Sequence, residues 1–128
     1  MEIQAVSTDA PLSWFSSAGP TKDGRQKPEI SAPGHQVIAA ATDTITSNTT
    51  DGVTAMSGTS MAAPAVTGVI ALVLAEAQAK GINLTIDQIR DILIKTARKN
   101  PPEGEGWNDR YGWGRIDASK AVEEIISM

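Results

Sequence analysis

The 128-residue sequence contains no cysteine, which excludes disulfide bonds, thiolate chemistry and cysteine-ligated zinc. Histidine is nearly as scarce: His35 is the single example, and the carboxylates are dispersed along the chain. We therefore expect no metal site and no cofactor within this segment. Aromatic side chains make up only 4% of the residues, whereas Ala, Val and Ile are plentiful. A core of small and branched side chains is expected, which suits an α/β fold.

A concentration of positive charge is also lacking. The formal net charge is −4, and the eleven Lys and Arg residues are scattered, so we expect no nucleic-acid partner. The N-terminus has no basic region followed by an apolar stretch, so this segment carries no signal peptide. The apolar run at residues 61–75 is shorter than the roughly 20 residues that cross a bilayer. We interpret it as a buried helix and expect no membrane partner.

The remaining pattern predicts short strands followed by helices. Extended segments are expected at residues 2–7, 28–33, 37–40 and 53–56. A helix is expected from about Ser60, and Thr67 is its one polar side chain between residues 61 and 75. A helix that is apolar on every side is typical of the middle of a larger protein.

Two amphipathic helices are expected nearer the C-terminus. Thr85 and Gln88 have the spacing of a capping box at the start of one, and Asp117 is the expected N-cap of the other. Their expected buried faces consist of Ile86, Ile89, Ile92, Leu93 and Ala97 in the first helix, and Ala118, Ala121, Val122, Ile125 and Ile126 in the second.

The segment Gly58-Thr59-Ser60-Met61-Ala62-Ala63-Pro64 carries the most chemical information. Gly58 allows a tight approach, and Pro64 is expected in the first helical turn, where a missing N–H matters little. Ser60 would then lie among unpaired N–H groups at the positive end of the helix dipole, where an oxyanion is stabilised. Ser60 could equally be an ordinary N-cap. The local chemistry permits a nucleophile without establishing one.

This segment resembles the serine motif of the subtilase family, the subtilisin-like serine peptidases. Three further segments resemble other motifs of that family, in the same order along the chain. They are residues 15–20 (FSSAGP), 27–34 (KPEISAPG) and 111–118 (YGWGRIDA). The resemblance covers nearly the whole chain. It implies that residues 1–128 are the C-terminal portion of a doubly wound α/β peptidase domain, with an incomplete sheet and a buried central helix.

The resemblance also implies a function and residue roles. The parent protein would be an endopeptidase that acts on peptide or protein substrates through an acyl-enzyme, and would be secreted or extracellular. Ser60 would be the nucleophile, with its backbone N–H as one oxyanion donor, while Gly58 and Thr59 shape the approach. Met61 would lie against the nucleophile at an oxidation-sensitive position, although it could also simply fill core space.

The partners of the serine are missing from this segment. In the family the chain order is Asp, His, Ser, so both partners and the oxyanion Asn belong far upstream. His35 follows Pro33-Gly34, a position that the family fills with a non-catalytic residue, and we expect it on the surface. Glu29 lies near a weak cation site of some members, but its companion ligands are absent. Calcium is therefore expected only in the full-length parent.

The apolar helix should consequently lack part of its cover. Fully burying one Val, Leu or Ile contributes roughly 1.5–3 kcal/mol, so several exposed apolar residues on one helix are strongly unfavourable. We expect this helix to bind the missing N-terminal portion or a second copy of the chain. The alternatives are a non-catalytic interaction module derived from a subtilase, and one chain of a nicked protease. An upstream Asp and His in the native gene would argue against the module.

We predict that the isolated 128-residue chain is catalytically inactive. A serine without a base to take its proton is a weak nucleophile, and positioned acid–base help alone is worth about 10²–10⁴ in rate. The measurement is turnover of a general peptide substrate and labelling by a fluorophosphonate probe. Robust turnover by the isolated chain would contradict the missing-base argument.

Overall fold

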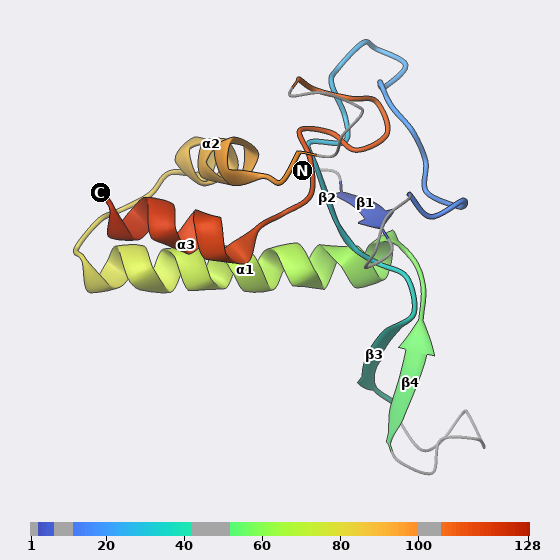
Figure 1. The fold of residues 1–128 in the computed structure, drawn as a ribbon, viewed down its shortest axis with the longest axis horizontal. Helices are drawn as coiled ribbons and strands as arrows, with labels where there is room; N and C mark the ends of the chain where they lie inside the picture. Colours follow the sequence, from blue (N-terminus) through green and yellow to red (C-terminus); the bar gives the residue numbers. More distant parts are fainter. Residues whose placement is uncertain (1–2, 7–11, 42–51, 100–105) are drawn as a thin grey trace.

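The structure, a computed structural model, describes residues 3–6, 12–41, 52–99 and 106–128 (Figure 1). Four strands and three helices lie within these residues, at the positions expected from the sequence, so the α/β class is confirmed. They are β1 (Ile3–Val6), β2 (Ile30–Pro33), β3 (Val37–Ala40), β4 (Val53–Met56), α1 (Thr59–Ala79), α2 (Ile86–Thr96) and α3 (Ala118–Ile126).

The strands form two separate pairs. β1 and β2 are parallel, with Ile3 opposite Ile30, and α1 packs against both. Ile30 and Ala32 of β2 are fully buried, as expected for a strand inside a parallel sheet. β3 and β4 form an antiparallel hairpin that projects away from the helices (Figure 1). The described part of the chain thus holds only two strands of the expected parallel sheet.

Helix α1 is buried along one side only. Its buried residues are Ala62, Val66, Val73 and Ala77, which lie on the side that contacts β1, β2 and α3. On other sides Leu72 is 55% exposed and Leu74 is 42% exposed. The described part of the chain therefore leaves some apolar residues of this helix exposed, as expected from the sequence.

The length of α1 differs from the expectation. The helix extends over 21 residues, so its length and apolar composition would allow it to cross a membrane. Such a match is weak evidence, since the core helix of a soluble protein has the same length and composition. Contacts of α1 with a sheet on one side and with α3 are those of a core helix.

The two amphipathic helices begin as predicted. Thr85 and Gln88 form the full capping box of α2, and the Asp117 side chain accepts a hydrogen bond from the Lys120 N–H at the start of α3. Their apolar faces are buried near the middle of each helix and open at one end. Ile86 is 85% exposed and Ile126 is 55% exposed, so the prediction of a buried position was wrong for both. Ile86 is the first residue of α2 and Ile126 is the last residue of α3, so each lies in a terminal turn.

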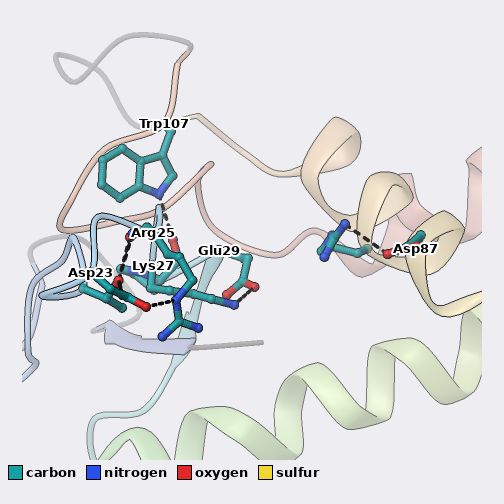
Figure 2. Close-up of polar contacts among 9 residues, drawn as sticks. Asp23, Arg25, Lys27, Glu29, Asp87 and Trp107 are labelled. Atoms are coloured by element: carbon teal, nitrogen blue, oxygen red, sulfur yellow. Dashed lines mark hydrogen bonds and ion pairs between the residues drawn. The ribbon is translucent and has the colours of Figure 1, made fainter.

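The C-terminal loop lies along the edge of β2 opposite β1. The Trp113 N–H donates to the Glu29 carbonyl (2.8 Å), the Ser31 N–H donates to the Gly114 carbonyl (2.9 Å), and the Ile116 N–H donates to the Ser31 carbonyl (2.9 Å). Figure 2 shows Trp107 over the start of this strand, where its indole N–H donates to the Pro28 carbonyl (2.9 Å). Backbone hydrogen bonds and the Trp107 indole thus hold this loop along β2.

The close approach of this loop to β2 requires glycine at position 112. Gly112 is buried, has φ +64°, and a Cβ atom there would lie 2.5 Å from the backbone of Glu29. Gly81, after the end of α1, has nearly the same conformation (φ +70°) but open space around it. The two glycines thus share a backbone preference and differ in crowding.

We predict that Gly112→Ala lowers the free energy of unfolding by about 3 kcal/mol, and Gly81→Ala by about 1 kcal/mol. Both variants place a side chain in the left-handed region, but only the first forces it into another backbone. Urea denaturation followed by tryptophan fluorescence measures both. Equal losses in the two variants would contradict the steric argument.

The cap of α3 generates a pH prediction. The Lys120 backbone N–H, and after it Arg98, hold the pKa of Asp117 below its ordinary value of 3.8. The carboxylate therefore stabilises the fold above pH 3.8, and this contribution is lost as the pH falls through the lowered folded-state pKa. Asp117→Ala should lower the free energy of unfolding by about 1 kcal/mol at pH 7. The difference in free energy of unfolding between Asp117→Ala and wild type should shrink below pH 3.8. Asp117→Asn keeps a capping acceptor, so it should lower the free energy of unfolding less than Asp117→Ala does at pH 7.

Candidate functional site

Ser60 is the second residue of α1, and its side chain is exposed. The N-cap of α1 is Gly58, and no side chain caps the helix. The alternative that Ser60 is simply the N-cap is therefore wrong, because the helix already begins at Thr59. An exposed hydroxyl with no capping duty at the start of a core helix is available for chemistry.

The first two N–H groups of α1 have no acceptor within the helix. The N–H groups of Met61 and Ala62 both donate to the Gly58 carbonyl, at 3.0 and 3.3 Å. The N–H groups of Thr59 and Ser60 precede these bonds, so helix geometry gives them no acceptor within α1. The first turn of α1 also contains no acidic side chain that would neutralise the helix dipole. The site therefore favours negative charge next to Ser60.

Gly58 fixes how the chain enters α1. Its backbone has φ 157° and ψ 165°, a combination found almost only in glycine. A Cβ atom there would lie 3.6 Å from the Met61 sulfur, which is ordinary contact, so the conformation rather than crowding requires glycine. The Gly58 N–H donates to the Gly34 carbonyl at 2.7 Å. The motif that contains Ser60 is thus held against the end of the extended 27–34 segment.

The other motif residues lie on the first two turns of α1. Thr59 is exposed beside Ser60, and Met61 is half-buried, which leaves both of its suggested roles open. Pro64 is the sixth residue of α1, not a first-turn residue as expected, because the helix begins at Thr59 rather than further along the motif. Proline has no N–H, so the Ser60 carbonyl receives no bond from position 64.

His35 is not hydrogen-bonded to Ser60 in the described part of the chain. Its side chain is exposed, as expected, and its ring stacks on Phe15 at 6.5 Å between ring centres. Among the described residues no hydrogen bond joins the Ser60 hydroxyl to a histidine or a carboxylate. The described residues therefore place the motif that contains Ser60 at a helix N-terminus, without a base hydrogen-bonded to the hydroxyl.

A second contact near Ser60 could not be expected from the sequence. The Gln36 N–H donates to the Ser57 hydroxyl oxygen at 2.8 Å, across the base of the β3–β4 hairpin. Gln36 has φ +49°, which is uncommon for a residue other than glycine. Glutamine has no special preference for this conformation, so no sequence pattern pointed to it.

Glu29 forms an ion pair with Lys27 beside the start of β2. Its side chain is 9% exposed and pairs with the Lys27 ammonium (Figure 2). Within the described ranges no three His, Asp or Glu side chains are placed to hold a metal ion. Beside the pair lies a cavity of about 350 Å³ between α1 and α2, with Ile70, Ile86 and Ile89 along it. Whether the full-length parent binds calcium stays an open prediction.

Comparison with known proteins identifies the family. A sequence model of the subtilase family matches residues 1–114. Pyrolysin from Pyrococcus furiosus is 35% identical over 125 residues, which are 94% of this chain and 9% of pyrolysin. Serine protease AprX from Bacillus subtilis is 33% identical over 129 residues, which cover 92% of this chain and 27% of AprX.

Solved structures agree with these sequence relatives. The CspB protease of Clostridium perfringens has a TM-score of 0.82 at 26% identity, over 98% of this chain and 26% of CspB. The PatG macrocyclase in complex with peptide has a TM-score of 0.75 at 27% identity, over 98% of this chain and 36% of that structure. The fold is that of part of a subtilisin-like serine peptidase. The chain belongs to the subtilase family, and it spans about a tenth to a quarter of the curated relatives described above.

Proposed function

We propose that the protein containing this chain is a serine endopeptidase, with Ser60 as its nucleophile. Family membership supports the reaction class. The observation that carries the residue assignment is the exposed hydroxyl of Ser60 at the uncapped N-terminus of α1. We further propose that an Asp, a His and an oxyanion Asn come from a portion of the protein outside these 128 residues. From the family resemblance we also propose that the full-length protein is secreted.

The proposed reaction begins when Ser60 Oγ attacks the carbonyl carbon of a peptide bond while its proton passes to the histidine base. The negative charge that develops on the carbonyl oxygen would be stabilised by the Ser60 N–H and the α1 dipole. The C–N bond then breaks, and the amine leaves with the proton from the histidine. Water hydrolyses the resulting ester and regenerates Ser60.

We propose that the uncovered parts of α1 pack against the N-terminal portion of the same peptidase domain. Leu72 and Leu74 are exposed on either side of the buried Val73, and placing such side chains in water is unfavourable. The match over only 26% to 36% of the two solved relatives supports this occupant, because most of their catalytic chain has no counterpart here. A second copy of the chain or an unrelated partner would replace this portion if the chain acts as a non-catalytic module.

The test is labelling of the full-length protein by a fluorophosphonate, with the modified peptide located by mass spectrometry. We predict that the label is on Ser60 and that Ser60→Ala removes both labelling and at least about 10⁴-fold of peptidase activity. We expect a peptide or protein substrate, and the PatG macrocyclase was solved in complex with a peptide.

Ser119 offers a matched control. It is also the second residue of its helix, α3, and is also exposed, but its hydroxyl donates to the Glu123 carboxylate at 3.1 Å. Ser119→Ala should keep both labelling and activity. Labelling that persists in Ser60→Ala, or a full-length protein that is never labelled, would refute the proposed nucleophile.

A further inference from the structure

The segment that leads into Ser60 is held mainly from outside α1. No side chain caps the helix, so its first residue is not fixed by a local hydrogen bond of the usual kind. Two contacts from the preceding turn reach this segment instead. The Gly34 carbonyl accepts from the Gly58 N–H (2.7 Å), and the Ser57 hydroxyl accepts from the Gln36 N–H (2.8 Å).

The Ser57 contact continues the hairpin by one step. Val37 is paired with Met56 at the end of the β3–β4 ladder, so Gln36 and Ser57 are the next residues on the two strands. There the Ser57 side chain replaces a backbone acceptor. This hydrogen bond therefore lies between the last pair of the hairpin and the Gly58 turn that precedes Ser60.

Gln36 needs such a partner because of its backbone. It is the one non-glycine residue with positive φ in the described part of the chain, at +49°. This conformation is unfavourable for a residue with a Cβ atom, and it persists where surrounding contacts hold it. His35 links Gln36 to Gly34 along the chain, and Val37, the next residue, begins β3. A change at Gln36 would therefore shift Gly34, and with it the Gly58 N–H contact.

We propose that Ser57 is a positioning residue for Ser60, and this proposal rests on the proposed function of Ser60 as nucleophile. The Ser57 hydroxyl holds Gln36 in the left-handed conformation, which keeps the Gly34 carbonyl in place for Gly58. Gly58 in turn sets where α1 begins. Ser57 touches neither substrate nor reacting atoms in this role. It acts through the geometry of the turn, and small misplacements of a nucleophile have large effects on rate.

The experiment compares Ser57→Thr with Ser57→Val in the full-length protein. The two side chains have the same shape, but only threonine keeps the hydroxyl acceptor. Fluorophosphonate inactivation is measured over a range of probe concentrations, so that the maximal rate constant and the half-saturating concentration are separated. We expect Ser57→Val to lower the maximal rate constant about tenfold with little change in half-saturation, and Ser57→Thr to stay within about twofold of wild type.

A second background separates positioning from general destabilisation. Gln36→Gly removes the conformational penalty at position 36 while keeping its N–H. In the Gln36→Gly background, the loss caused by Ser57→Val should shrink to about threefold or less, because glycine adopts the turn without the hydroxyl. A general loss of stability would instead be the same in both backgrounds. Should Ser57→Val fail to fold, Ser57→Ala takes its place under the same criteria.

The outcomes separate the two proposals. A wild-type protein that is not labelled on Ser60 would overturn the proposed function and this inference with it. A wild type that is labelled on Ser60, with equal maximal rate constants in Ser57→Thr and Ser57→Val, would overturn only the role of Ser57. An equal loss with and without Gln36→Gly would likewise overturn the role of Ser57.

Discussion

The structure depends on the burial of one side of α1 against β1, β2 and α3. Small residues allow this close contact: Ala62 and Ala77, near the two ends of the helix, are 0% and 1% exposed, and Val66 and Val73 lie between them. Because the helix is held along this whole side, its N-terminus has a fixed position at the end of the sheet. Ser60 is exposed at that N-terminus. The packing of an apolar helix thus places a polar group where it can react.

Much of the fold could be predicted because the signals are local. The capping box of Thr85 and Gln88 and the Asp117 cap act within a single turn, so their residue types are sufficient to locate the helix starts. The exposure of Ile86 and Ile126 could not be predicted in the same way. An apolar stripe shows which face of a helix can be buried, but the extent of the neighbouring helix decides where burial ends.

The candidate site was predictable in part. The glycine at position 58 and the run of apolar residues after Ser60 indicated a tight turn into a core helix, which the structure confirms. The family motif predicted which serine is the nucleophile, and that assignment stays a prediction. The place of Pro64 was missed because it depends on where α1 begins, and Gly58 rather than Ser60 determines that start. The Gln36–Ser57 hydrogen bond was missed because it joins residues 21 positions apart. It also depends on a positive φ at Gln36, which glutamine does not favour.

The loop at residues 113–116 also determines how the parallel sheet can be extended. This loop forms hydrogen bonds with one edge of β2, and β1 occupies the other edge. Both edges of β2 are therefore taken, and an incoming strand cannot pair with it. Arg115 of the loop also pairs with Arg98 on the side away from β2, so the position for a further parallel strand of the same sheet is beyond β1. The parallel sheet can therefore be extended on the β1 side only. The C-terminal loop blocks extension on the other side.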